Sequence, residues 1–146
     1  MHVSLVTIIS GSESDSDLVK KVESVLSDFG VSFDSHVASA HRSPEKLKNI
    51  VNSSNSKVFI GVAGLSAALP GAIASYTTKP VVGLPKNVKL EGLDSFLSMA
   101  QMPPGIPVAT VGVDNAKNAA LLAMEILAIN DEKLERKLRD YRESKK

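Results

Sequence analysis

Short apolar runs alternate along the chain with stretches in which apolar residues recur every three or four positions. The runs are rich in β-forming residues, which is typical of strands buried on both faces. They occupy residues 3–9, 31–38, 58–62, 81–84 and 108–111. The stretches between and after them predict helices. These occupy residues 18–29, 44–51, 64–76, 93–101 and 115–129.

This strand–helix order predicts an α/β fold with a parallel sheet, because parallel strands need crossover connections. Right-handed crossovers then give a doubly wound, flavodoxin-like sandwich of three layers. Local signals predict where helices begin and end. Ser14 with Asp17 resembles a capping box, Pro44 occupies a first helical position, Asn115 is a candidate cap and Gly30 ends a helix.

The last segment, residues 131–146, predicts an extra C-terminal helix outside a domain formed by residues 1–130. Most of its residues are charged, and Leu134, Leu138 and Tyr141 lie on one face of it. Such a stripe is typical of a solvated helix on its own domain, or of an arm that packs on a neighbouring subunit. Because a thin apolar face gains little on its own domain, we expect this helix to pack on a second copy of the chain.

Length and composition exclude several classes of protein. The chain has 146 residues, which is the size of one domain. Its 17 Lys and Arg balance 16 Asp and Glu, so a nucleic-acid binder is not expected. With no cysteine and three histidines, disulfides, thiol nucleophiles and metal sites are not expected. No apolar run approaches the roughly 20 residues that cross a membrane, and no signal-peptide pattern is present, so we expect a cytoplasmic protein.

In a doubly wound sheet, ligands bind outside the carboxyl ends of the strands. Three segments that follow predicted strands are rich in small or polar residues, and they cover residues 11–15, 39–42 and 63–71. A rigid proline-rich loop, residues 101–107, precedes the last strand. We therefore expect the ligand among these segments.

The first of these segments, GSESD, precedes a helix N-terminus, where free N–H groups and the helix dipole favour a phosphate. Its serine hydroxyls add donors, and Asp15 can accept from ribose hydroxyls. Ordinary helix capping would use the same residues. The segment has neither the Walker A nor the GxGxxG pattern, which disfavours kinases and dinucleotide enzymes.

The second segment, SAHRSP, places a histidine and an arginine together at a strand end. His41 is of the residue type that titrates near neutral pH and suits general acid–base catalysis. Arg42 offers a planar fork for phosphate or carboxylate, and a pair of ordinary surface residues is the alternative interpretation. Of the other histidines, His36 is expected to be structural and His2 to be a terminal residue.

The motifs GSESD, SAHRSPEK, AGLSAALPG and QMPPGIPVATVG occur in this order over essentially the whole chain, followed by NAALLAMEILA. In this combination the sequence resembles the PurE family, the N5-carboxyaminoimidazole ribonucleotide mutases of purine biosynthesis. The resemblance implies a flavodoxin-like fold and a homo-octamer. It also implies transfer of a carboxylate from N5 to C4 of the imidazole without metal, ATP or organic cofactor.

Matched position by position, the resemblance implies roles for individual residues. His41 matches the catalytic acid/base, and Asp15 matches the residue that holds the ribose hydroxyls. Ser12 and Arg42 match residues at the phosphate. The other positions expected to line the substrate pocket are Ser14, Ser39, Ala63, Gly64, Leu65 and Leu69. The implied substrate is a phosphorylated imidazole ribonucleotide.

One position departs from the family pattern, since Ala68 stands where the bacterial mutases have a histidine. A branch that carboxylates aminoimidazole ribonucleotide directly with carbon dioxide also lacks this histidine and has a serine at the position of Ser66. That branch, however, has Lys at the position of Arg42 and an Arg-Ser-Asn motif that is absent here. We therefore predict a mutase, with the direct carboxylase as one alternative and a non-catalytic nucleotide-binding or signalling module as another.

Overall fold

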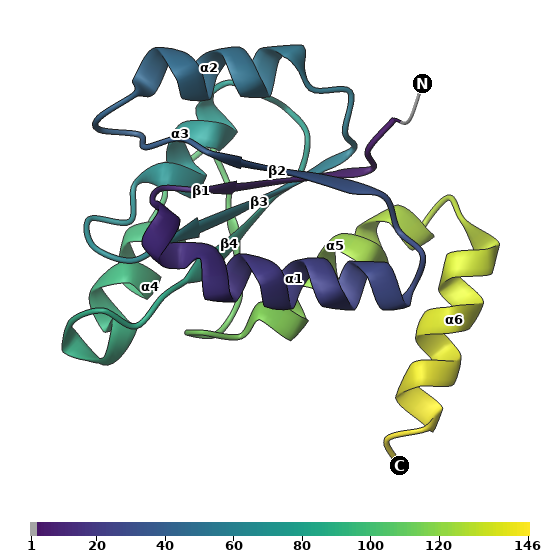
Figure 1. The fold of residues 1–146 in the computed structure, drawn as a ribbon. Coiled ribbons are helices and arrows are strands. Elements are labelled where there is room, and N and C mark those ends of the chain that lie inside the picture. Colours follow the sequence, from purple (N-terminus) through teal and green to yellow (C-terminus); the bar gives the residue numbers. More distant parts are fainter. Residues whose placement is uncertain (1–2) are drawn as a thin grey trace.

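The structure, a computed structural model that describes residues 3–146, has a five-stranded parallel sheet with helices on both faces (Figure 1). His2 lies outside the described residues. Within residues 3–146, no helix is both long enough and apolar enough to span a membrane. The elements in chain order are β1 (Val6–Ser10), the short 3-10 helix η1 (Glu13–Asp15), α1 (Ser16–Asp28), β2 (Phe33–Val37), α2 (Pro44–Ser53), β3 (Val58–Ala63), α3 (Leu69–Ser75), β4 (Val81–Pro85), the 3-10 helix η2 (Leu90–Gly92), α4 (Leu93–Ala100), β5 (Ala109–Thr110), α5 (Ala116–Ala128) and α6 (Glu132–Glu143).

The strands lie in the order β2-β1-β3-β4-β5, and every neighbouring pair is parallel. This is the flavodoxin-like order, so the predicted fold class is confirmed. The order reverses between β1 and β3, where connections leave for opposite faces of the sheet. Ser10 pairs with Val37 on one side and with Val62 on the other, so the first three strands end side by side. The loops that follow these strands therefore meet at one edge.

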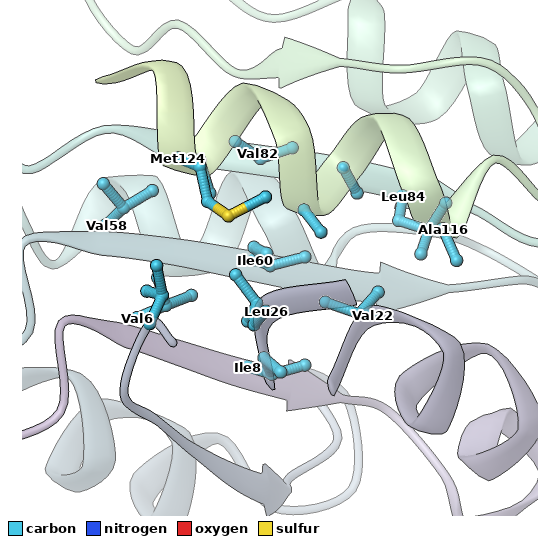
Figure 2. Packing of buried hydrophobic residues seen from close by; sticks show 14 of the residues in the cluster. Val6, Ile8, Val22, Leu26, Val58, Ile60, Val82, Leu84, Ala116 and Met124 are labelled. Atoms are coloured by element: carbon cyan, nitrogen blue, oxygen red, sulfur yellow. The ribbon is translucent and has the colours of Figure 1, made fainter. Parts of the chain in front are cut away.

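Successive residues of the central strands are buried on opposite faces of the sheet. One core lies under α1 and α5, where Val6, Ile8 and Ile60 pack with Leu26 and Met124 (Figure 2). The other core lies under α2 and α3, where Ile9 and Phe59 belong to a second buried cluster that α4 joins through Met99. Burial on both faces explains why these strands are continuously apolar in sequence.

The helix after the first site loop begins differently from the prediction. The capping box joins Ser12 and Asp15, not Ser14 and Asp17. Ser12 is extended, with φ −157° and ψ 155°, and it starts the tight turn η1 before α1 begins at Ser16. Two other predicted helix boundaries, the end of α1 and the start of α5, are confirmed. Gly30 follows α1 with φ +73°, and the Asn115 side chain accepts from the backbone N–H of Asn118 at 3.0 Å.

The predicted C-terminal helix is present as α6, and its apolar stripe faces its own domain. Leu134 and Leu138 are buried in the core cluster shared with α1 and α5. The ring of Tyr141 lies edge-on to Phe29 at 5.7 Å, and Lys137 Nζ donates to the carbonyl of Phe29 at 2.8 Å. These contacts stabilise α6 within one chain, and packing on a second copy stays a prediction.

Candidate active site

A cavity of about 450 Å³ opens at the carboxyl ends of β1, β2 and β3. This is the edge at which doubly wound sheets bind ligands. Every residue expected from the sequence to act in catalysis or substrate binding lines it, so three separate loops converge on one site. The lining residues are Gly11, Ser12, Ser14, Asp15, Ser39, Ala40, His41, Arg42, Ala63, Gly64, Leu65, Ser66, Leu69 and Val88.

The loop after β1 is held by reciprocal hydrogen bonds. The backbone N–H of Ser12 donates to Asp15 Oδ2 at 3.1 Å, and the Ser12 hydroxyl accepts from the backbone N–H of Ser14 at 3.3 Å. The Ser14 hydroxyl also donates to that of Ser12 at 3.1 Å. Asp15 is buried, whereas Ser14 is exposed. The turn thus presents hydroxyls and the N-terminal end of a helix to the cavity, beside a fixed carboxylate.

The loop after β2 is shaped by two serines. The Ser39 hydroxyl accepts from the backbone N–H groups of His41 at 3.3 Å and Arg42 at 3.1 Å. The backbone N–H of Ser39 in turn donates to the Ser43 hydroxyl at 3.0 Å. These bonds order the turn and leave His41 and Arg42 exposed at the cavity. Ser39 therefore orders the backbone that carries His41 and Arg42, as well as lining the site.

The loop after β3 brings the backbone close to the cavity because its residues are small. A Cβ at Gly64 would lie only 2.5 Å from Val88 Cγ2, so this position has no room for a side chain. Ser66 has a φ of +43°, in the left-handed region that non-glycine residues seldom occupy. Backbone conformations of this kind are concentrated at functional sites. The segment thus combines a steric requirement with a strained turn.

The apolar side of the cavity is formed by only part of the predicted segment 63–71, together with a residue from another loop. Leu65 and Leu69 line it as expected, and Val88 from the loop after β4 joins them. Ala67 is buried in the second core cluster, and Ala68 is exposed and lies outside the lining.

The sequence analysis did not identify two residues near the cavity, Val88 and Lys86, and it expected one loop there that lies elsewhere. Val88 lines the cavity, and Lys86 contacts the loop after β1. Both residues follow β4, whose carboxyl end lies at the same sheet edge, and this position could have indicated them. Conversely, the proline-rich loop of residues 101–107 lies outside the cavity lining. Its Met102 packs against α3, where a Cβ at Gly71 would lie 3.0 Å from the Met102 sulfur.

His36 lies in a separate cluster. Its Nε2 is 2.6 Å from Asp34 Oδ2, and Asp34 Oδ1 accepts from the buried Thr7 hydroxyl at 2.7 Å. These contacts agree with the structural role expected for it. Among residues 3–146, the His, Asp and Glu side chains form no group of three that could hold a metal ion.

The side chains around the cavity suit an anionic ligand and proton transfer. Arg42 Nη2 donates to the carbonyl of Gly11 at 3.2 Å, so the guanidinium lies beside the turn that carries Ser12 and Ser14. Guanidinium and hydroxyl donors beside a helix N-terminus together suit an anionic group such as phosphate. The imidazole of His41 suits proton transfer at the same site.

Comparison with known proteins assigns the family. A sequence model of the family described as AIR carboxylase matches residues 5–146. The chain belongs to the AIR carboxylase family. The N5-carboxyaminoimidazole ribonucleotide mutase of Methanocaldococcus jannaschii is 56% identical over 142 residues, which are 97% of this chain and 90% of that protein. The mutase of Pyrococcus abyssi is 51% identical over 145 residues, covering 97% and 83% of the two chains.

Solved structures of this family share the fold. The crystal structure of Treponema denticola PurE has a TM-score of 0.89 and 31% sequence identity, and the match covers 97% of this chain and 91% of that one. A single-substitution variant of PurE2 from the same organism has a TM-score of 0.89 and 30% identity, covering 99% and 92%. The resemblance to the PurE family that the motifs indicated is therefore confirmed.

Proposed function

We propose that this member of the AIR carboxylase family is an N5-carboxyaminoimidazole ribonucleotide mutase of purine biosynthesis. It would move the carboxylate from N5 to C4 of the imidazole and give 4-carboxy-5-aminoimidazole ribonucleotide. The observation that carries the proposal is the convergence of the His41–Arg42 turn and the turn of residues 12–15 on one cavity. The relatives reported above are all named as mutases or PurE proteins, which favours an enzyme over a non-catalytic nucleotide-binding or signalling module.

In this proposal the phosphate of the substrate lies between Arg42 and the turn that begins at Ser12. The hydroxyls of the turn and the guanidinium supply its donors, and the positive end of the helix dipole favours its charge. Asp15, at the base of the same turn, accepts from the ribose hydroxyls. The imidazole ring then extends toward His41 and Ser39, with Leu65 and other residues of the third loop along its side.

The chemistry requires one group that first gives and then takes a proton. Protonated His41 donates to N5 as the bond from N5 to the carboxylate carbon breaks, and carbon dioxide leaves. C4 of the aminoimidazole then attacks carbon dioxide and forms the new carbon–carbon bond. Neutral His41 removes the hydrogen from C4, which restores the ring and the protonated imidazole. One proton is gained at N5 and one is lost at C4, so the reaction is an isomerisation.

Ala68 bears on the choice between the mutase and direct carboxylation of aminoimidazole ribonucleotide. It lies outside the cavity lining, so the lining is formed without a contribution from this position. The proton transfers need one titrating group, which His41 supplies, and Leu65, Leu69 and Val88 form the apolar side of the cavity that would hold carbon dioxide. The absence of a histidine at position 68 is therefore compatible with mutase chemistry.

The proposal includes a homo-oligomer, an octamer by resemblance to the family, in which α6 contacts a neighbouring subunit. Support comes from a groove of about 340 Å³ between α5 and α6, lined in part by Leu121, Leu122 and Tyr141. Ile129, between the two helices, is 78% exposed. The proposal also places the enzyme in the cytoplasm, because a phosphorylated substrate does not cross a membrane readily and is used where it is made.

The decisive experiment is turnover of each candidate substrate by the purified protein. N5-carboxyaminoimidazole ribonucleotide should be converted to the C4 carboxylate without bicarbonate, ATP or added metal. Aminoimidazole ribonucleotide with carbon dioxide is the parallel reaction that tests direct carboxylation. Conversion of neither compound, with no shift in melting temperature on adding either, would refute an enzyme of this class.

A further inference from the structure

Lys86 is a positively charged residue behind the cavity that the proposed mechanism does not use. It directly follows β4, and its backbone is fixed from two sides. Its N–H donates to the carbonyl of Ala63 at 2.9 Å, and its carbonyl accepts from the hydroxyl of Ser95 at 2.9 Å. The side chain therefore starts from a fixed point at the edge of the sheet.

From that point the side chain extends to the loop after β1. Lys86 Nζ donates to the carbonyl of Ser14 at 2.5 Å and lies 3.5 Å from Asp15 Oδ1. Strand β3 lies between β1 and β4, so the side chain crosses the carboxyl end of that strand. A Cβ at Gly64 would be 3.7 Å from Lys86 Cβ, which places the crossing beside this glycine.

The Asp15 carboxylate is thereby held through both oxygens. Oδ2 accepts from the backbone N–H of Ser12 at 3.1 Å, and Oδ1 faces the Lys86 ammonium. The Asp15 side chain is 7% exposed and that of Lys86 is 24% exposed. Withdrawing two charged groups from water is unfavourable unless each is paired and hydrogen-bonded, as these are. The pair therefore adds a second contact that fixes the direction of the carboxylate, beside the hydrogen bond from Ser12.

We propose that Lys86 is a positioning residue for nucleotide binding, acting through Asp15. It holds the carboxylate so that its remaining lone pairs face the ribose hydroxyls, and it ties the carbonyl of Ser14 to the end of β4. Lys86 lies outside the cavity lining, so the proposal gives it no contact with the reacting imidazole. This inference rests on the proposed function, because it assumes a ribonucleotide above Asp15.

A first test separates positioning from chemistry. Lys86→Met keeps the unbranched side chain as far as Cε and removes the ammonium group, and it should raise KM for N5-carboxyaminoimidazole ribonucleotide about tenfold. Its kcat should stay within about threefold of wild type, since proton transfer at His41 is unchanged. Lys86→Arg should recover most of the loss. The control is Lys89→Met, which removes a charge from the same loop at an exposed position and should match wild type.

A second test asks whether Lys86 acts through Asp15. Binding of 4-carboxy-5-aminoimidazole ribonucleotide is measured by calorimetry for Lys86→Met, Asp15→Asn and the double variant. If Lys86 works through the carboxylate, the double variant should bind within about twofold of Asp15→Asn. Losses that multiply would overturn the inference, as would Lys86→Met binding that equals wild type.

The outcomes also separate this inference from the proposed function. Wild-type protein that binds no imidazole ribonucleotide overturns both. Wild-type binding that is unchanged in Lys86→Met overturns the positioning role alone. If Lys86→Met does not fold, Lys86→Gln is measured in the same cycle. A lower melting temperature with unchanged ligand affinity would show that the lysine only supports the fold, and would also overturn the inference.

Discussion

The guanidinium of Arg42 donates a hydrogen bond to the backbone carbonyl of Gly11, 3.2 Å away, although 31 positions separate them in sequence. The contact exists because β1 and β2 are parallel neighbours whose last residues, Ser10 and Val37, pair with each other. One of the five guanidinium N–H groups is used in this contact. The other N–H groups are available to a ligand. The bond therefore holds the Arg42 guanidinium beside the turn where the phosphate is proposed to bind.

The first prediction concerns the acid/base. His41→Asn should keep the fold and the affinity for nucleotide but lower kcat about 10²-fold or more, because proton transfer at N5 and C4 is lost. Steady-state kinetics and a ligand titration measure the two effects. His36→Asn is the matched control, since His36 lies in the separate cluster with Asp34. Turnover of His41→Asn within a few-fold of wild type would remove this residue from the mechanism.

The second prediction concerns the phosphate site. Arg42→Ala or Ser12→Ala should weaken substrate binding by about 1.5–3 kcal/mol, the range for hydrogen bonds to charged groups. The dephosphorylated nucleoside should bind wild-type protein poorly and should lose little further affinity in the variants. Arg139→Ala, on the exposed surface of α6, controls for net charge. Equal binding of nucleoside and nucleotide to wild type would contradict the phosphate assignment.

The third prediction concerns the contact between two site loops. Gly64→Ala should destabilise the fold by about 1–3 kcal/mol, because its Cβ would lie 2.5 Å from Val88 Cγ2. Val88→Ala in the same chain should recover most of that loss. Thermal unfolding of the three proteins measures the effect. Gly11→Ala is the control, since among residues 3–146 its added Cβ would have no atom within 4 Å beyond its chain neighbours, and an equal loss there would contradict the steric explanation.

The fourth prediction separates the two roles of α6. Leu134→Ala should destabilise the subunit by about 2–5 kcal/mol, because Leu134 is buried in the core of its own chain. Deletion of residues 131–146 should in addition give a smaller or less stable oligomer by light scattering. Arg136→Ala, at an exposed position of the same helix, should change neither. A monodisperse monomer of the full-length chain would contradict the proposed assembly.

The fifth prediction concerns the fate of carbon dioxide. During conversion of N5-carboxyaminoimidazole ribonucleotide, labelled carbon dioxide in the buffer should enter the product slowly relative to turnover, because the released molecule is retained in the cavity. The labelled fraction of product against time is the measurement. If instead aminoimidazole ribonucleotide takes up label stoichiometrically while the N-carboxylated compound is ignored, the chain is a direct carboxylase.

The sequence alone determined the fold class and the loops of the site. Continuous apolar runs such as residues 58–62 report burial on both faces, and their alternation with helices requires parallel strands. Parallel strands end at the same edge of a sheet, so the sequence alone predicted that His41 and Ser12 lie near one another. Their residue types then indicated an anionic ligand and proton transfer.

The tertiary structure decided the contacts that local patterns do not encode. The capping box lies two positions earlier than predicted, because the 3-10 turn η1 precedes α1 and Ser12 caps that turn. The bond from Lys86 to Ser14 joins residues 72 positions apart, and it depends on which strand lies between β1 and β4. Periodicity reports whether a residue is buried, whereas its partner is set by strand order and by the packing of loops.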